Sequence, residues 1–194
     1  MARKQAADYE QRREAIVDHA ARLFASRGFL GASVADLARA CGQSKSLIYH
    51  YYPSKEDILF EVMDSHLLQL TGAVETVTGS QAPAERKLRD LTHRFMGLYV
   101  GAVDRHKVLL NDLNHLPADR RTLIVTRQRA LIDAVQALIA AVRPDLATPR
   151  ARRPLTMLFF GMINWTHTWF DPTGAASSDE VAELAAELIL GSRK

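Results

Sequence analysis

The chain has 194 residues, of which 47% are hydrophobic and 24% charged, a balance that is ordinary for a globular protein. Its single cysteine excludes an internal disulfide and a cysteine-rich metal cluster. The first 30 residues contain no apolar core of a secretory leader, and the longest nearly apolar run, residues 155–165, is too short to cross a bilayer. We therefore expect a cytoplasmic protein without a membrane segment, a metal site or a cofactor.

Positive charge is concentrated near the N-terminus. Residues 1–55 hold nine Lys or Arg and five Asp or Glu, whereas the rest of the chain holds 16 and 17. A basic segment on a nearly neutral body indicates a polyanionic partner such as nucleic acid. A solvated basic terminus has the same composition, so charge alone leaves both interpretations open.

Hydrophobic residues recur with helical spacing along nearly the whole chain, and no segment alternates convincingly with period two. The first helix is predicted over residues 8–26, followed by Gly28 where a left-handed C-terminal cap is needed. A second helix follows Ser33, which begins a capping box. A third, short helix ends near Tyr52, because Pro53 disfavours helical backbone in the residue before it.

Six further helices are predicted in the rest of the chain, with a connection rich in proline and arginine before the last two. Their ranges are 54–78, 83–103, 104–113, 118–142, 155–170 and 179–190. About nine helices leave little room for a sheet, so we predict an all-α fold. We divide it into an N-terminal helix-turn-helix domain of three helices, residues 1–53, and a C-terminal helical domain, residues 54–194.

The second and third helices, joined by a turn that contains Gly42, match a helix-turn-helix, in which the second helix enters the major groove of DNA. Ile48 and Tyr52 can face inward. The outer side chains are hydroxyls, a cation and aromatic donors suited to phosphates and base edges, with a leucine that can touch a thymine methyl. They are Lys45, Ser46, Leu47, Tyr49 and His50, with Lys55 at the start of the next helix as a further cation. A solvated face of a short amphipathic helix would show the same residue types.

The run ASRGFLGASVADLARACGQSKSLIYHYYPSKED, residues 25–57, resembles the N-terminal domain of the TetR family. The resemblance implies an all-helical homodimer that represses transcription and releases DNA when a small molecule enters its C-terminal domain. By position it also implies DNA contacts at Ser33, Lys45, Ser46, Tyr49, His50 and Lys55. A dimer presents two recognition helices about 34–36 Å apart, so the operator is expected to be an inverted repeat.

Two apolar stripes near the C-terminus are predicted to form the dimer interface as a four-helix bundle. Core packing within one chain is the alternative, and the family resemblance favours the dimer. The stripes consist of Leu155, Leu158, Phe159 and Met162 on one helix and Val181, Leu184, Leu188 and Ile189 on the other.

An effector site is expected where apolar walls carry a few polar groups, although each of these residues could instead belong to the core. The candidates are Phe95, Met96, Tyr99, Leu113, Asn164, Trp165, Thr168 and Trp169. The run GMINWTHTWFDP, residues 161–172, resembles the corresponding segment of TetR-type regulators that respond to acyl-CoA thioesters. This implies a hydrophobic acyl-CoA or related catabolic thioester as effector, and Arg120 and Arg127, which share a helix face, could hold its phosphates.

Three alternatives remain open. The repressor could respond to another hydrophobic small molecule such as a drug or a free acid, or the chain could be a ligand-insensitive or architectural DNA-binding protein. A small helical enzyme is a third alternative, but the sequence lacks the G-x-S-x-G, P-loop, H-E-x-x-H and G-x-G-x-x-G motifs. The seven histidines show no close pair spaced for one helix face, which argues against a metal site.

Overall fold

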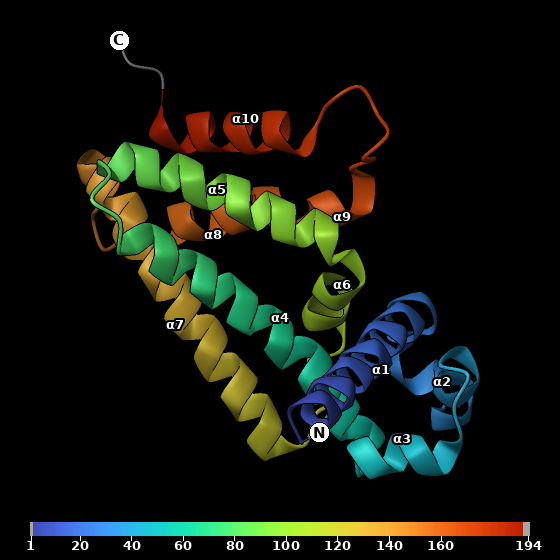
Figure 1. Cartoon of the computed structure of the whole chain (residues 1–194). Helices are drawn as coiled ribbons and strands as arrows, with labels where there is room; N and C mark the ends of the chain where they lie inside the picture. Colours follow the sequence, from blue (N-terminus) through green and yellow to red (C-terminus); the bar gives the residue numbers. More distant parts are fainter. Residues whose placement is uncertain (1, 192–194) are drawn as a thin grey trace. The chain divides into compact units, whose positions relative to one another are not determined.

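The computed structural model describes residues 2–191, with side chains from residue 8 onward, and every regular element in that range is a helix (Figure 1). This confirms the predicted all-α fold. The α-helices are α1 (Ala2–Gly31), α2 (Val34–Ala40), α3 (Lys45–Tyr51), α4 (Lys55–Thr78), α5 (Ala84–Gly101), α6 (Val103–Asn111), α7 (Ala118–Val142), α8 (Arg152–Asn164), α9 (Thr166–Trp169) and α10 (Ser178–Leu190), with short 3₁₀ helices at Leu113–His115 and Pro144–Leu146. Across the described residues, no helix combines the length and the hydropathy needed to cross a membrane.

The helices form two compact units. Unit 1 comprises the chain up to residue 66 together with residues 104–124, and unit 2 comprises residues 67–103 and the chain from residue 125 onward. Helices α4 and α7 each supply residues to both units. Because these units are defined by packing, the functional division of the chain at residue 53 stays a prediction.

Local signals explain the elements at the start of unit 1. Helix α1 begins at Ala2 rather than near residue 8, because residues 2–7 are good helix formers. It breaks at Gly28, whose φ of 72° is positive as expected, although its ψ of 158° is extended rather than left-handed helical. Ser33 caps α2 in the predicted capping box with Asp36, and Ser44 caps α3.

The core of unit 1 gathers the apolar faces of its first four helices. Phe24 of α1, Leu37 of α2 and Ile48 of α3 are all almost completely buried. Ile58 and Leu59, near the start of α4, are completely buried as well. Burial of these side chains fixes the orientation of α3, so that its opposite face is left to the solvent.

Unit 2 is built around α5, with α8 and α10 packed against it, and α10 runs alongside α5 (Figure 1). Phe95 and Phe159 are completely buried, and the ring of Phe95 lies 6.2 Å from that of Phe160. The single helix predicted over residues 155–170 is divided into α8 and α9 at Trp165. The hydroxyl of Thr166 donates to the Ile163 carbonyl, and such hydroxyls compete with backbone hydrogen bonds at a helix end.

Candidate functional site

The outer face of α3 carries four exposed polar side chains, namely Lys45, Ser46, Tyr49 and His50. Leu47 beside them is half-buried, and Ile48 on the opposite face is completely buried. The ammonium of Lys45 lies 5.7 Å from the centroid of the Tyr49 ring. Ammonium, hydroxyl and imidazole groups on one exposed helix face can donate to phosphate oxygens and base edges. The structure thus brings these residues together, while their contacts with DNA stay predictions.

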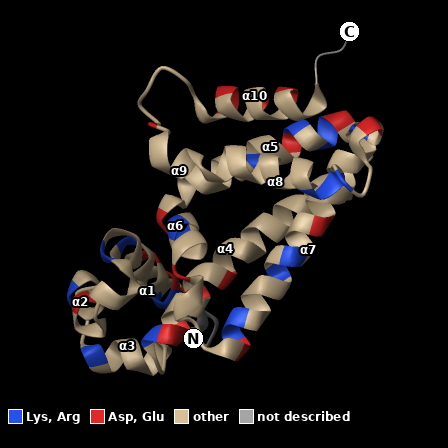
Figure 2. Ribbon diagram, turned by 180° about the vertical axis from the view of Figure 1, so that it is seen from behind, with Lys and Arg blue, Asp and Glu red and all other residues tan. Residues whose placement is uncertain are grey.

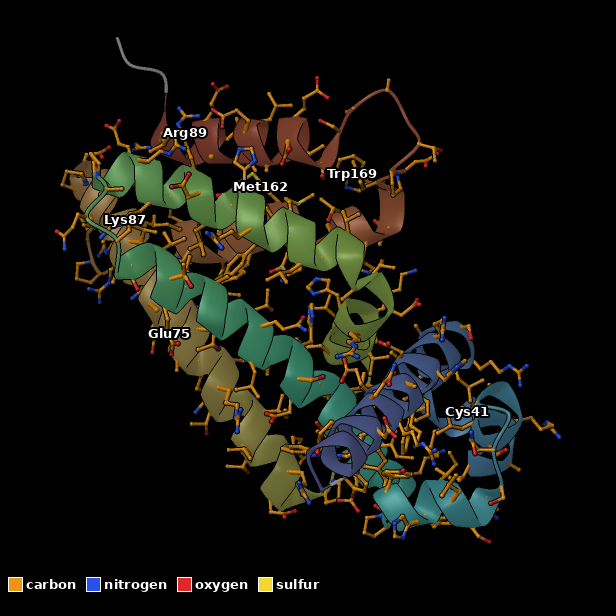
Figure 3. The ribbon with its side chains drawn as sticks, viewed as in Figure 1. Cys41, Glu75, Lys87, Arg89, Met162 and Trp169 are labelled. Atoms are coloured by element: carbon orange, nitrogen blue, oxygen red, sulfur yellow. The ribbon has the colours of Figure 1, made fainter. Side chains whose placement is uncertain are left out.

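Ser33, the other hydroxyl predicted to contact DNA, is engaged in its own helix cap. Its Oγ donates to Asp36 Oδ2 at 2.5 Å and accepts from the Asp36 N–H at 3.1 Å. Hydrogen bonds from Ser33, together with the Arg39 guanidinium, hold the pKa of the Asp36 carboxyl below its usual range. The cap fixes the N-terminus of α2, whose C-terminal end reaches Cys41 and the turn into α3 (Figure 3).

Lys55 points into unit 1 instead of lying free on the surface. Its Nζ donates to the carbonyl oxygens of Phe29 at 2.7 Å and of Ala32 at 2.8 Å, and lies 4.0 Å from the centroid of the Phe29 ring. The ammonium therefore has a structural role in the turn between α1 and α2. Its predicted contact with a phosphate stays a prediction.

An ionic cluster in unit 1 joins residues that no sequence pattern had pointed to. Arg105 on α6 is almost completely buried, and its guanidinium donates to Glu14, to Asp18 at 2.7 Å and to the Ser65 hydroxyl at 3.0 Å. Arg105 precedes the buried residues Val108 and Leu109 by three and four positions, so it lies on the same face of α6. An arginine on an otherwise apolar helix face is the sequence signal that could have predicted this cluster.

A histidine pair lies in the same unit. His66 Nε2 is 3.2 Å from His106 Nδ1, and both side chains are buried. Burial, together with the charge of Arg105, lowers the pKa of His66 to about 4. The imidazole of His66 is therefore neutral near pH 7, which removes the cost of burying a charge there.

The predicted effector residues are divided between the two units. Leu113 and Arg120 belong to unit 1, where Arg120 pairs with Asp57 at 3.0 Å and lies 4.5 Å above the Phe60 ring. The other candidates, Phe95, Met96, Tyr99, Arg127, Asn164, Trp165, Thr168 and Trp169, belong to unit 2. Arg120 and Arg127 both belong to α7, along which Figure 2 shows basic residues in blue.

Within unit 2 these candidates have different surroundings. Phe95, Met96 and Tyr99 are buried along α5, and burial raises the pKa of the Tyr99 hydroxyl. Asn164 Oδ1 is buried and has no hydrogen-bond partner among the described residues. Thr168 is exposed, and its hydroxyl donates to the Trp165 carbonyl. Of this set, the buried oxygen of Asn164 is the group that a ligand could satisfy.

An apolar groove of 880 Å³ runs along α8, α9 and α10 of unit 2. Its lining includes five of the predicted dimer residues, namely Leu158, Met162, Val181, Leu184 and Leu188. Leu158 and Leu188 are 65% and 70% exposed. Trp165 and Trp169, predicted for the effector site, line the same groove; Met162 and Trp169 are labelled in Figure 3.

The remaining three predicted interface residues are less accessible. Phe159 and Ile189 are buried within their own chain, and Leu155 is half-buried. These three side chains lie outside the groove lining, and contact with a second copy stays a prediction for all eight interface residues. Gly161 lies in the groove lining, and a Cβ there would meet no neighbouring atom.

Charged side chains fasten α10 onto α5. Arg89 forms an ion pair with Glu183 and lies 3.9 Å from Glu187. His93 stands between two carboxylates, with Nδ1 3.0 Å from Asp179 and Nε2 3.3 Å from Glu183. These contacts hold one wall of the apolar groove in place, and Arg89 is marked on α5 in Figure 3.

Two known protein-family models match this chain, one in its N-terminal part and one in its C-terminal part. Residues 16–62 match the family model described as "Bacterial regulatory proteins, tetR family". Residues 81–192 match the model described as "Tetracyclin repressor-like, C-terminal domain". The first match contains the whole helix-turn-helix, and the second contains the apolar groove and the helices around it.

Similar proteins carry the names of transcriptional regulators. The HTH-type transcriptional repressor KstR2 of Mycolicibacterium smegmatis is 29% identical over 193 residues, covering 93% of this chain and 89% of the relative. A TetR-family regulator structure from Bordetella parapertussis 12822 is 39% identical and superimposes with a TM-score of 0.86, covering 92% and 93% of the two chains. The structure of AibR in complex with isovaleryl coenzyme A and operator DNA is 26% identical, with a TM-score of 0.79 and coverage of 90% and 96%.

Proposed function

The chain belongs to the TetR family of transcriptional repressors rather than to an enzyme family, and we propose that it binds an inverted-repeat operator as a cytoplasmic homodimer. The observation that carries this proposal is the outer face of α3, where Lys45, Tyr49 and His50 are exposed above the buried Ile48. Side chains of this kind on a recognition helix reach phosphates and base edges in a major groove.

The second copy is expected to cover the apolar groove. Leucine side chains as exposed as Leu158, Leu184 and Leu188 are costly to leave in water when they are clustered. Pairing α8 and α10 with the same helices of a second chain would bury them in an isologous four-helix bundle. Such a dimer would present two α3 helices to successive major grooves.

DNA binding is tested with a labelled duplex that carries the inverted repeat beside the gene of this protein. Lys45→Ala removes a cation from the exposed face and is expected to weaken binding and to reduce its salt dependence, since fewer counterions are released. Arg121→Ala is a matched control, because Arg121 is an exposed cation on α7, outside the helix-turn-helix. Equal affinity of wild type and Lys45→Ala over a range of salt concentrations would contradict this role of α3.

A hydrophobic acyl-CoA or related thioester is the proposed effector class. Support comes from the similarity to AibR, whose structure contains isovaleryl coenzyme A, and from the buried acceptor Asn164 Oδ1. The pantetheine arm of CoA carries amide N–H groups that can donate to such an oxygen. The second candidate is another hydrophobic small molecule, such as a drug or a free acid, favoured by the apolar character of the predicted effector residues Phe95 and Met96.

Matched ligand pairs separate the two effector classes. Each CoA thioester is titrated into the protein–operator complex beside the free acid of the same acyl chain and beside CoA alone. Release by thioesters only is the expected result, since release requires a ligand that favours the state unable to bind DNA. Release by free acids, with thioesters inactive, would exclude the thioester class and leave the proposed DNA binding untouched.

A further inference from the structure

The turn between α1 and α2 is held by side chains from two distant parts of the chain, all within unit 1. Lys55 fastens it through the carbonyl oxygens of Phe29 and Ala32. Asp112, which follows α6, accepts a hydrogen bond from the Phe29 backbone N–H through Oδ1 at 3.4 Å. Residues 28–32 run from the break of α1 at Gly28 to the residue before the α2 cap, and we call this segment the α1–α2 turn. It is thus anchored both to the start of α4 and to the segment after α6.

The Phe29 side chain is the centre of this arrangement. It is 4% exposed, and its ring lies 5.3 Å from the imidazole of His115, with an angle of 21° between the planes. The Phe24 ring packs against it in a T-shaped arrangement with 5.4 Å between the ring centroids, and the Lys55 ammonium is 4.0 Å from the Phe29 ring centroid. Stacking and cation–π contacts of this kind each add to the burial of the ring and restrict its position.

The position of this turn determines where the helix-turn-helix begins. Ser33, the cap of α2, follows Ala32 directly in the chain. Helix α2 in turn packs on α3, where Leu37 and Ile48 are both buried. A displacement of the turn would therefore move α2, and α3 with it, away from the arrangement that fits a major groove.

Asp112 is an unusual residue for a purely stabilising contact. Its side chain is 11% exposed, and a carboxylate buried this far loses most of its hydration. His115 Nε2 lies 3.7 Å from Asp112 Oδ1, so the two residues of this segment that touch Phe29 also lie beside each other. Apolar residues often stabilise such sites equally well, whereas a carboxylate that accepts from one backbone N–H fixes a single arrangement.

We propose that Asp112 and His115 are positioning residues for operator binding, which act through Phe29 to hold the α1–α2 turn and thereby α3. The proposal rests on the DNA contacts proposed for α3. It assigns the segment after α6 a direct part in setting DNA affinity, although this segment is separated from the helix-turn-helix by more than 50 positions in the sequence.

Two pairs of variants separate positioning from general stability. Asp112→Ala and His115→Ala remove the acceptor and the stacked ring, whereas Asp112→Asn and His115→Phe keep an acceptor oxygen and an aromatic ring. We expect each alanine variant to bind the operator at least about fivefold more weakly, as loss of one hydrogen bond or aromatic contact predicts. The operator affinity of the conservative variants should stay within about twofold of wild type, a smaller change than the loss of one such contact would cause.

The readouts are operator affinity by fluorescence anisotropy, its salt dependence, and the melting temperature. Misplaced recognition helices lose phosphate contacts, so the alanine variants should also show a shallower salt dependence. Unchanged affinity of His115→Ala and Asp112→Ala, or equal losses in alanine and conservative variants, would overturn the proposal. If Asp112→Ala does not fold, the two His115 variants decide the question.

Tyr49→Phe is measured alongside as a marker of the α3 contact itself. If Tyr49→Phe weakens operator binding while all four variants behave like wild type, positioning by this segment is wrong and DNA contact by α3 stands. If the alanine variants weaken binding while Tyr49→Phe and Lys45→Ala do not, the positioning of the turn stands and the contacts assigned to α3 fail.

Discussion

Two tyrosines of α3 have different surroundings although they are only two positions apart. Tyr49 is 42% exposed, whereas Tyr51 is half-buried with its ring 4.8 Å from that of Tyr9. The hydroxyl of Tyr49 can therefore be removed without disturbing packing. This makes Tyr49 a suitable residue for separating DNA contact from folding.

Tyr49→Phe should weaken operator binding by about fivefold, since one hydrogen bond contributes about 1 kcal/mol. Fluorescence anisotropy with the labelled operator measures the change, and the melting temperature should stay that of wild type. Tyr51→Phe is the matched control, because it removes a hydroxyl from the same helix. Equal losses in the two variants, or none in Tyr49→Phe, would argue against a specific contact at Tyr49.

His66 makes stability depend on pH. Burial lowers the pKa of His66 to about 4 from an ordinary 6.5. In the pH window between these two values, the unfolded chain binds a proton at His66 that the folded chain excludes. The unfolded state is therefore favoured progressively as pH falls below 6.5, and the stabilising contribution of neutral His66 is lost toward pH 4. Above this window the contribution is present in full.

Between pH 7 and pH 5 we expect His66 to lower the free energy of unfolding by about 2 kcal/mol. His66→Gln places an amide near the position of the imidazole Nε2 and removes the titration, so its stability should vary less with pH by about this amount. Urea unfolding followed by circular dichroism at a fixed protein concentration measures both proteins. The same pH dependence in both would assign the effect to other groups.

At the level of the elements, the break in α1 depends on one glycine. Gly28 has φ 72° and ψ 158°, a backbone conformation that is essentially restricted to glycine. Gly31, three residues later, has no positive φ, and a Cβ there would meet only the Cβ of Arg27 at 3.7 Å, an ordinary contact. The two glycines therefore form a matched pair within one turn of the chain.

Gly28→Ala should destabilise the protein by about 1–3 kcal/mol because of backbone strain. For a chain of this length that corresponds to a decrease in melting temperature of about 2–12 °C. Gly31→Ala should leave the melting temperature at or slightly above that of wild type, since alanine favours helical backbone. Differential scanning calorimetry compares the two, and equal melting temperatures would show that the break tolerates a side chain.

The elements that the sequence predicts well are those with local causes. The cap at Ser33, the positive φ of Gly28 and the end of α3 before Pro53 each depend on a few adjacent residues. The same holds for the exposed face of α3, because burial of Ile48 follows from helical periodicity.

Contacts between distant segments could not be predicted in this way. Arg105 meets Glu14 and Asp18, and Phe29 meets Asp112, over separations of more than 80 residues. Helical periodicity specifies which face of a helix is buried but not which residue lies opposite. For the same reason the predicted effector residues include Leu113 and Arg120, which belong to unit 1 whereas the others belong to unit 2.

At the level of the whole molecule, the apolar groove predicts how many chains form the active protein. Leu188 on α10 is 70% exposed in the groove lining. Leu68 on α4 is 53% exposed and is not part of that lining. The same substitution at these two leucines therefore separates a buried dimer contact from an ordinary exposed leucine.

Leu188→Glu should shift the protein from dimer to monomer, because a second copy of the groove would bury two carboxylates in an apolar interface. The mass from light scattering should fall toward the 21.6 kDa of one chain, while Leu68→Glu keeps the mass of the dimer. Operator affinity should fall by more than about tenfold in Leu188→Glu, since a monomer contacts only one half-site. A Leu188→Glu protein that keeps both the dimer mass and full operator affinity would place the dimer interface elsewhere on the molecule.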